Sequence, residues 1–467
     1  CCKVTGVQTC ALPISGGYVA ALKAAMLGAE VTVIEKNKLG GTCLNVGCIP
    51  TKALLASADV LRTVKEAKDF GVVVEGEVKP DFDAIIARKQ KVTDELVAGI
   101  QFLFDKRGVK KIDGFGKLVD KNTIEVTKAD GTVETVVADK IILANGSIPT
   151  VFPGMPYNGK NVITSDEVLS LPKQPESLII VGGGVIGSEI GQFFATIGTK
   201  VTIVEMAPQI LGRMDSEAAK SLTRQFKKDK IKVMTGVGAD NYIVNDDSVK
   251  IELNNGKSVE AEMVLLCVGR RPNLANSGVE EVGIEMAPRG FIKVNEYLET
   301  SVEGVYAIGD IIPGAMLAHV ASAEGMVAAA NAVKGNSETV NYKAIPSCVY
   351  TEPEVSGVGV TEDELKANGT PYNVGRFEFR SLGKAKAIGK LQGFIKVMAD
   401  ENDTIIGASL VGPHVTDLLT ELSLAVGLGL KAKDVGKVIH AHPSLSEGLM
   451  EAIHDIHGEC VHAIPKK

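Results

Sequence analysis

The stretch between residues 177 and 205 constrains the fold most strongly, because it carries every part of a nucleotide-binding unit in the right order. The apolar run Ser177–Val181 predicts a buried strand. A G-x-G-x-x-G loop and a helical pattern follow, and Val201–Glu205 predicts a second strand that ends in an acid 23 residues after Gly182. Strand, glycine loop, helix and strand in this order predict a βαβ unit of a parallel sheet that binds a dinucleotide.

The residues of this loop have separate expected roles. Gly182 makes the tight turn, Gly184 lets the backbone approach a pyrophosphate, and Gly187 lets the helix pack on the strand. Glu205 favours NAD over NADP, since an acid bonds a ribose 2′-hydroxyl and repels a 2′-phosphate; a strand-end charge without a ligand is the alternative. We therefore expect NAD to contact Gly182, Gly184, Val185, Ile186, Gly187, Glu189 and Glu205.

The N-terminal region contains the back half of a second such unit. Gly16 and Gly17 open a helical pattern, and Val31–Glu35 predicts a strand that ends in an acid. Residues 1–15 contain Gly, Gln, Thr and Pro, which interrupt a buried strand, and they lack the apolar core of a signal peptide. We therefore expect that residues 1–15 are a non-native segment and that the first strand and two loop glycines are missing.

Two cysteines five positions apart, Cys43 and Cys48, lie in the glycine-rich stretch Gly40–Lys52. Five residues rotate by about 140° on an ideal helix, and a disulfide needs Cα atoms within roughly 7 Å. A bridge therefore requires a distorted turn, which Gly47 and Pro50 are suited to supply. Two structural cysteines or half a zinc site are the alternatives. No second C-x-x-C or His-x-x-x-His accompanies the pair, so we expect a redox disulfide and no metal.

The stretch Gly40–Lys52, both nucleotide units and the C-terminal stretch His440–Glu447 together resemble the class I pyridine nucleotide–disulfide oxidoreductases, from about residue 16 onward. The resemblance implies an α/β fold with two Rossmann-like dinucleotide-binding domains and a C-terminal α+β dimerisation domain. It implies the cofactors FAD and NAD. The implied domains are a non-native segment 1–15, the FAD domain 16–148 and 273–342, the NAD domain 149–272, and the dimerisation domain 343–467.

The resemblance also implies the active site. Cys43 and Cys48 form the redox disulfide, and His442 of the partner subunit is the base that Glu447 orients. Lys52 lies by the reactive flavin edge and pairs with a glutamate, and Gly269 approaches the nicotinamide end of NAD. The FAD contacts implied are Gly16, Gly17, Glu35, Lys52, Gly116, Gly146, Asp310, Met316, Leu317, Ala318 and His319.

The implied activity is the oxidation of dihydrolipoamide, carried on lipoyl domains of 2-oxo acid dehydrogenase or glycine cleavage complexes, by a homodimer with a shared active site. A glutathione reductase-like or mercuric reductase-like activity is an alternative, which Glu205 and the absence of a C-terminal cysteine pair oppose. Another is an inactive NAD-binding scaffold or assembly subunit, because the FAD unit lacks its first strand.

Composition restricts the remaining function classes. The net charge of −7 gives no basic footprint for nucleic acid, and no uninterrupted apolar run reaches the roughly 18 residues of a membrane span. Eight scattered cysteines indicate a reducing compartment in which one disulfide is catalytic. We therefore expect a cytoplasmic protein, or a mitochondrial matrix protein in a eukaryote.

Overall fold

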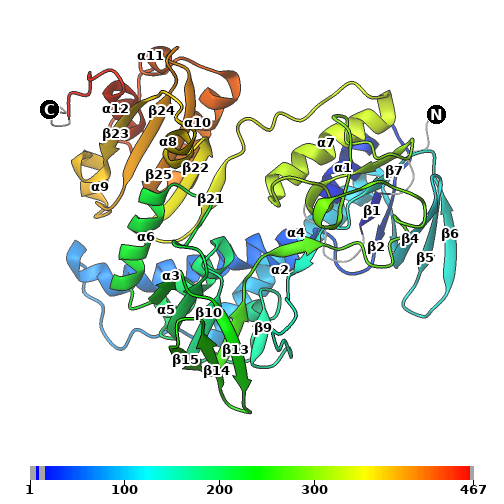
Figure 1. Ribbon diagram of the computed structural model, residues 1–467, viewed down its shortest axis with the longest axis horizontal. Coiled ribbons are helices and arrows are strands. Elements are labelled where there is room, and N and C mark those ends of the chain that lie inside the picture. The colour runs from blue at the N-terminus through cyan, green and yellow to red at the C-terminus, as the bar shows by residue number, and fades with distance from the viewer. Residues whose placement is uncertain (1–6, 10–15, 463–467) are drawn as a thin grey trace.

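The unit predicted at residues 177–205 forms the centre of a parallel five-stranded sheet in the computed structural model, which describes residues 7–9 and 16–462 (Figure 1). The strand order is β12-β11-β10-β16-β9, and the helices α5 and α6 connect β10 to β11 and β11 to β12. We call this the NAD sheet. Its elements are β9 (Val162–Thr164), β10 (Ser177–Val181), α5 (Val185–Ile197), β11 (Lys200–Glu205), α6 (Ser216–Lys228), β12 (Lys232–Thr235) and β16 (Met263–Leu266). A smaller antiparallel sheet inserted in it comprises β13 (Ala239–Val244), β14 (Val249–Leu253) and β15 (Ser258–Ala261).

A second parallel sheet, the FAD sheet, has the strand order β20-β7-β1-β2-β3. Chain segments far apart in sequence build it, and the helices α1 and α7 lie side by side on it (Figure 1). Its elements are β1 (Val7–Thr9), α1 (Gly16–Met26), β2 (Thr32–Glu35), β3 (Lys110–Asp113), β7 (Ile141–Leu143), β20 (Val305–Ala307) and α7 (Ala318–Lys334). Shorter pieces flank it: the meander β4 (Phe115–Asp120), β5 (Thr123–Thr127) and β6 (Val133–Val137), and the pairs β8 (Ser147–Pro149) with β17 (Arg270–Pro272) and β18 (Met286–Ala287) with β19 (Phe291–Ile292).

The prediction that the first strand of the FAD unit is missing is wrong. Val7–Thr9 form β1, which pairs in parallel with β2 on one side and with β7 on the other. Backbone N–H and C=O groups form such a ladder whatever side chains the strand carries, so the interruptions that argued against a strand did not prevent a short one. The positions where loop glycines were expected to be missing, 10–15, lie outside the described residues, as do residues 1–6.

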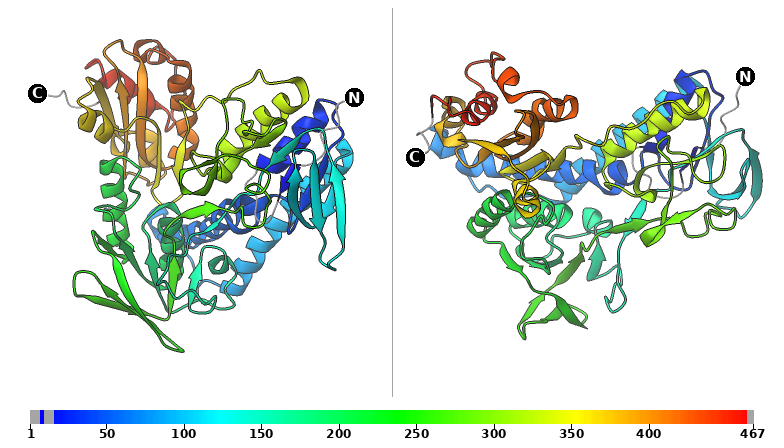
Figure 2. Two further views of the ribbon diagram at one scale, coloured as in Figure 1. Left: turned by 45° about the vertical axis from the view of Figure 1, so that its right-hand side comes forward. Right: turned by 45° about the horizontal axis from the view of Figure 1, so that its top comes forward.

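An antiparallel sheet with the strand order β21-β22-β25-β24-β23 forms the core of the C-terminal module. The helices α10 and α12 pack on this sheet, and its opposite face lies against the NAD sheet, where Val355 and Val411 share a core with Phe193 of α5. Two further views agree on this arrangement (Figure 2). The elements of the module are β21 (Ser347–Val349), β22 (Glu354–Gly359), α8 (Glu362–Asn368), β23 (Asn373–Glu378), α9 (Gly383–Ala387), β24 (Phe394–Ala399), β25 (Ile405–Gly412), α10 (Val415–Leu428), α11 (Ala432–Val435) and α12 (Glu447–Asp455). The predicted fold class is confirmed.

Three helices connect the two nucleotide sheets: α2 (Gly41–Val46), α3 (Cys48–Glu66) and α4 (Phe82–Arg107). By length and composition alone, the helical stretch 41–70 could cross a membrane. Its buried residues instead belong to the core of the protein, since Leu54 and Leu61 pack in one cluster with Phe194 of α5. The stretch is therefore a core helix that joins the FAD sheet to the NAD sheet.

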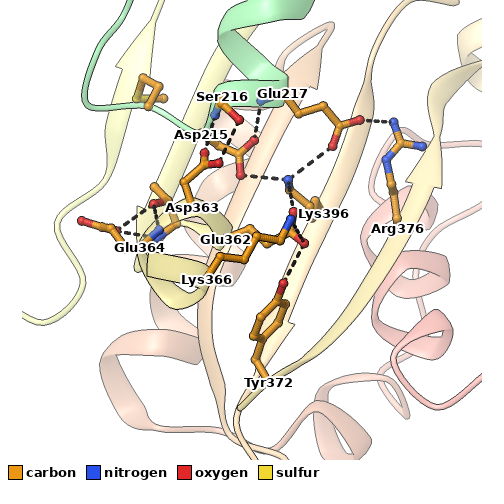
Figure 3. A network of polar contacts seen from close by, with 12 residues as sticks. Asp215, Ser216, Glu217, Glu362, Asp363, Glu364, Lys366, Tyr372, Arg376 and Lys396 are labelled. Carbon is orange, nitrogen blue, oxygen red and sulfur yellow. Dashed lines mark hydrogen bonds and ion pairs between the residues drawn. The ribbon is translucent and has the colours of Figure 1, made fainter. Parts of the chain in front are cut away.

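Buried charges fasten the C-terminal module to the NAD sheet (Figure 3). Lys396 of β24, whose side chain is 3% exposed, places its Nζ 2.8 Å from carboxylate oxygens of Asp215 and Glu362 and 3.3 Å from one of Glu217. Asp215 also caps α6, and Arg376 of β23 contacts Glu217 at 2.7 Å. We call these five residues the Lys396 network. No sequence motif pointed to it.

Candidate active site

The two cysteines meet where the helix is broken. α2 ends at Val46, α3 begins at Cys48, and Gly47 between them has φ −145° and ψ −116°. A Cβ at Gly47 would lie 2.8 Å from the carbonyl oxygen of Thr42, so a larger residue would displace this turn. The predicted distortion is therefore confirmed, with Gly47 as its cause.

Cys48, the first residue of α3, is hydrogen-bonded to Cys43 across this break. A hydrogen bond to Cys43 and burial raise the pKa of the Cys48 thiol above its ordinary value, while the charge of Lys52 acts in the opposite direction. Contact between the two sulfur groups is what thiol–disulfide exchange requires.

Lys52, one turn further along α3, forms an ion pair with Glu189 of α5. Its Nζ lies 2.8 Å from Glu189 Oε2, and the Glu189 side chain is 3% exposed. The ring of Tyr350 lies 4.4 Å from the same Nζ, measured to the ring centroid. Glu189 is also a predicted NAD contact, and its carboxylate faces Lys52 because the second turn of α5 points toward α3. Sequence reasoning missed Tyr350, whose only signal was its place at a strand end.

Asp310 presents an open acceptor at the FAD sheet. Its Oδ2 accepts a hydrogen bond from Ser147 Oγ at 2.5 Å, and its buried Oδ1 has no hydrogen-bond partner among the described residues. Arg270 supports this arrangement by donating from Nε to Ser147 Oγ at 2.8 Å. Burial raises the pKa of Asp310 to about 6, against the lowering effects of Ser147 and Arg270. Asp310 was predicted, whereas Ser147 and Arg270 were not.

A second buried carboxylate, Glu324 of α7, lies beside Asp310. Its Oε2 accepts from the backbone N–H of Gly309 at 2.7 Å, and its Oε1 accepts from the Tyr342 hydroxyl at 2.9 Å. Burial raises the pKa of Glu324 to about 7, and the charge of Asp310 acts in the same direction. Glu324 fixes the turn that carries Asp310. An acid within an alanine-rich helix was the only sequence signal for it.

Small residues leave space next to Asp310. A Cβ at Gly16 would lie 2.6 Å from the carbonyl oxygen of Ala321, so the glycine allows α1 and α7 to approach closely. Only a narrow cavity lies between them, lined by Gly16, Gly17, Ala144, Gly146, Ile308, Gly309, Asp310 and Ala321. Four of the predicted FAD contacts, Gly16, Gly17, Gly146 and Asp310, are thus brought together.

The other predicted FAD contacts lie around this cavity in the fold. Glu35 is buried at the end of β2 and accepts from the backbone N–H of Asn37 at 2.9 Å. Gly116 is a buried residue of β4. Burial lowers the pKa of His319, against a hydrogen bond to the backbone of Pro346. The remaining three predicted contacts precede or begin α7, whose N-terminus offers positive potential: Met316, Leu317 and Ala318.

The NAD loop has the geometry that its sequence predicts. Gly182 has φ +109°, and a Cβ there would lie 2.2 Å from the carbonyl oxygen of Cys267. Gly187 packs as closely, with a Cβ position 2.1 Å from the carbonyl oxygen of Gly182, whereas Gly184 faces open space. Glu205 Oε2 accepts from the backbone N–H of Gly183 at 2.6 Å. Val185 and Ile186 begin α5, and Gly269 has φ +120° and open space beside it.

His442 and Glu447 are paired as predicted. His442 Nδ1 lies 2.8 Å from Glu447 Oε1, and the His442 side chain is 77% exposed. The other carboxylate oxygen of Glu447 accepts from the backbone N–H of Ser444 at 2.9 Å, and these hydrogen bonds lower the pKa of Glu447 despite some burial. The second ring nitrogen of His442 is thereby presented to the surface. His440 contacts Glu421 at 3.0 Å, in keeping with a structural role.

The arrangement as a whole fits two dinucleotides and one dithiol. The open Asp310 acceptor and the glycines beside it suit FAD, and the loop at Gly182 suits a pyrophosphate. The cysteines lie at the break between α2 and α3, between the two sheets. These features define the class of two-cofactor thiol–disulfide oxidoreductases.

Comparison with known proteins identifies the family. The family description "Pyridine nucleotide-disulphide oxidoreductase" matches residues 15–325, and its dimerisation domain matches residues 345–453. Dihydrolipoyl dehydrogenase of Bacillus subtilis (strain 168) is 42% identical over 462 residues, which cover 96% of this chain and 97% of the relative. The mitochondrial dihydrolipoyl dehydrogenase of Sus scrofa is 39% identical over 448 residues, which cover 94% and 88%. The crystal structure of LpdA from Mycobacterium tuberculosis has a TM-score of 0.89 and 26% identity, and the match covers 97% of this chain and 99% of that chain.

The chain therefore belongs to the pyridine nucleotide–disulphide oxidoreductase family. The family's cofactors are FAD and NAD, and the C-terminal module is its dimerisation domain.

Proposed function

We propose that the protein is a dihydrolipoyl dehydrogenase, which oxidises dihydrolipoamide to lipoamide and reduces NAD. The observation that carries the proposal is the position of the Cys43–Cys48 dithiol. It lies beside the Lys52–Glu189 ion pair, at the break between the helices α2 and α3, which lie between the two dinucleotide-binding sheets. Relatives of about this length and with about 40% identity bear that name.

The proposed reaction begins from the Cys43–Cys48 disulfide. His442 of the partner subunit, oriented by Glu447, takes a proton from one substrate thiol, and the resulting thiolate attacks Cys43. The Cys43–Cys48 bond breaks, and Cys48 leaves as a thiolate that Lys52 stabilises. The second substrate thiol then attacks the substrate sulfur of the mixed disulfide, which releases lipoamide and returns Cys43 as a thiol. The two electrons of the substrate now reside in the protein dithiol.

The chain's own groups position both cofactors. Asp310 would accept hydrogen bonds from the ribityl hydroxyls of FAD, Glu35 would accept from its adenosine ribose, and the N-terminus of α7 would supply positive potential for the flavin. The chemistry that bound FAD would supply is transfer of the electron pair of the dithiol to NAD. Glu205 would accept from the adenosine ribose of NAD, and Gly269 would leave room for its nicotinamide.

The proposal includes boundaries, partners and location. The FAD domain comprises residues 16–148 and 273–342 together with the strand β1, the NAD domain 149–272 and the dimerisation domain from 343, because β20 returns to the FAD sheet after the NAD sheet is complete. The homodimer acts on lipoyl domains of 2-oxo acid dehydrogenase or glycine cleavage complexes. It works in the cytoplasm, or in the mitochondrial matrix of a eukaryote, as the relatives named mitochondrial do.

Replacement of one active-site cysteine tests the function. We expect Cys48→Ser to lower dihydrolipoamide–NAD turnover by at least about 10³-fold, since no disulfide can form, while the visible flavin spectrum is kept. Cys267→Ser is the matched control, because burial raises the pKa of this thiol to about 12 and the thiol is not part of the cysteine pair. Retained turnover in Cys48→Ser would reject the disulfide mechanism. A colourless parent protein that still binds NADH would instead support an NAD-binding scaffold.

A further inference from the structure

Tyr350, the first residue after β21, contacts the Lys52–Glu189 pair from two sides. Its ring centroid lies 4.4 Å from Lys52 Nζ, and its backbone N–H donates to Glu189 Oε1 at 2.9 Å. Lys52 Nζ donates to both oxygens of Glu189, at 2.8 Å to Oε2 and at 3.1 Å to Oε1. A residue of the C-terminal module thus holds both charges of an ion pair that joins α3 to α5.

The residues after Tyr350 are fastened to the same face of α5. The backbone N–H of Glu352 donates to Gln192 Oε1 at 2.7 Å, and Gln192 Nε2 donates to the backbone carbonyl of Glu352 at 2.7 Å. Gln192 lies one turn after Glu189 and is 1% exposed. Three hydrogen bonds therefore fix the backbone that carries Tyr350 next to the ion pair.

The ring changes the surroundings of Lys52 in a way that affects Cys48. An aromatic face attracts an ammonium group and excludes water from one side of it. Burial raises the pKa of Tyr350 to about 12, so the ring stays a neutral phenol near neutral pH. Lys52 lies one helical turn after Cys48, and its charge lowers the pKa of that thiol, whereas Cys43 and Glu189 raise it. The position of one ammonium group therefore affects how readily Cys48 becomes a thiolate.

We propose that Tyr350 is a positioning residue, which keeps the Lys52 ammonium between Cys48 and Glu189 and so makes thiolate formation at Cys48 depend on the C-terminal module. The proposal rests on the proposed role of Cys48 as the thiolate that leaves during exchange. It extends the active site to the dimerisation domain of the same chain, in addition to the histidine supplied by the partner subunit.

The thiolate itself gives the test. Holoenzyme carrying Cys43→Ser, which leaves Cys48 as the thiol of this site, is alkylated with iodoacetamide across a pH range, and modification of the Cys48 peptide is followed by mass spectrometry. We expect Tyr350→Leu to raise the apparent pKa of Cys48 by about 0.5 to 1.5 pH units, the equivalent of a lost cation–π contact. Tyr350→Phe keeps the ring and should restore the parental value. Tyr157→Leu is a matched control, because this tyrosine is exposed and contacts Glu167 instead.

A double-mutant cycle separates positioning from a general disturbance of the fold. In a Lys52→Met background, Tyr350→Leu should cause no further rise in the pKa of Cys48. Equal pKa values for the Leu and Phe variants, or a full shift in the Lys52→Met background, would overturn the proposal. Tyr350→Met, which fills similar space, replaces the Leu variant if that variant does not retain FAD.

Steady-state kinetics with both cysteines present provide the second measurement. We expect Tyr350→Leu to lower kcat by about 2- to 30-fold, with little change in KM for NAD or dihydrolipoamide. The alkylation titration does not depend on dihydrolipoamide. A protein without dihydrolipoamide turnover but with the expected Cys48 titration would reject the proposed function and keep the role of Tyr350.

Discussion

Two regions of this protein contain carboxylates whose pKa values are shifted in opposite directions. In the Lys396 network, hydrogen bonds and charges from Lys396 and its neighbours outweigh burial and lower the pKa of Glu362 to about 2. Beside the FAD sheet, burial is the largest influence, and it raises the pKa of Asp310 to about 6 and that of Glu324 to about 7. The first region is a closed set of ion pairs, whereas the second contains carboxyl groups without an ion-pair partner among the described residues.

The difference separates a structural contact from a binding site. Lys396 satisfies its carboxylates within the chain, and the result fastens the dimerisation domain to α6 (Figure 3). Asp310 Oδ1 is buried without a hydrogen-bond donor among the described residues, which destabilises the fold in the absence of a ligand. Such an oxygen is expected where a bound ligand supplies the donor. The two regions should therefore respond differently to substitution, to pH and to FAD.

Removal of the buried lysine should have the largest effect. We expect Lys396→Met to lower the free energy of unfolding by about 3–5 kcal/mol, because it leaves carboxylates buried without their cation. Urea titration followed by circular dichroism measures this change. Turnover of the folded fraction should stay near the parental value, since Lys396 lies outside the redox site.

Lys366→Met is the control for that loss. Lys366 also pairs with Glu362, at 2.9 Å, but its side chain is 60% exposed, so its removal should cost at most about 1 kcal/mol. If both variants lost a similar free energy of unfolding, burial of Lys396 would add nothing to stability. The Lys396 network would then not differ from exposed ion pairs.

Substitution of a carboxyl group beside the FAD sheet should have the opposite effect on stability: the protein should become more stable. The pKa of Glu324 in the folded protein is about 7, above its ordinary value of 4.5, so the unfolded chain loses this proton first as the pH rises. The stability of the apoprotein therefore falls between about pH 4.5 and pH 7. We expect Glu324→Gln to remove this decline and to be more stable than the parent by about 3 kcal/mol above pH 7.5.

Unfolding of the apoprotein at pH 4 and at pH 8 checks this expectation. The two proteins should have equal stability at pH 4, where Glu324 is protonated in both states, and should differ at pH 8. The carboxyl group of Glu362 provides the contrast, because its lowered pKa stabilises the fold above about pH 4.5 and that stability is lost as the pH falls toward 2. A Glu324→Gln protein that is less stable than its parent at pH 8 would contradict the raised pKa of Glu324.

Sequence reasoning located the parts of the site that follow from local chain geometry. The NAD loop and the break at Gly47 each depend on residues a few positions apart, and both have the predicted form. The His442–Glu447 pair lies within one short segment and was also found. Glu205 lies next to the loop as expected, with its carboxylate on a loop N–H.

Contacts between distant segments were not predictable in the same way. Glu189 follows the loop and stays a predicted NAD contact, but its contacts with Lys52, 137 residues earlier, and with Tyr350 could not be read from the sequence. Lys396 lies in a buried strand without any motif, and only the packing of α6 on the sheet reveals its partners. The strand β1 was rejected on its side chains, although its backbone pairing alone places it in the sheet.

The smallest expected effect tests the open acceptor itself. Asp310→Asn keeps the size of the side chain and an oxygen for Ser147, but it replaces the open carboxylate oxygen by an amide that cannot accept. We expect FAD to bind about 10- to 100-fold more weakly, the usual loss for a hydrogen bond to a charged group, as measured by flavin fluorescence on titration of the apoprotein. FAD binding by the parent should weaken as the pH falls below about 6, where Asp310 is protonated, and this dependence should be absent from the variant.

Asp166→Asn is the control, since this acid lies at the far side of Arg270, with Oδ1 3.8 Å from Nη1. Equal FAD affinity in Asp310→Asn and the parent would mean that the open oxygen is not a ligand contact, and the two carboxylate regions would then differ in pKa alone.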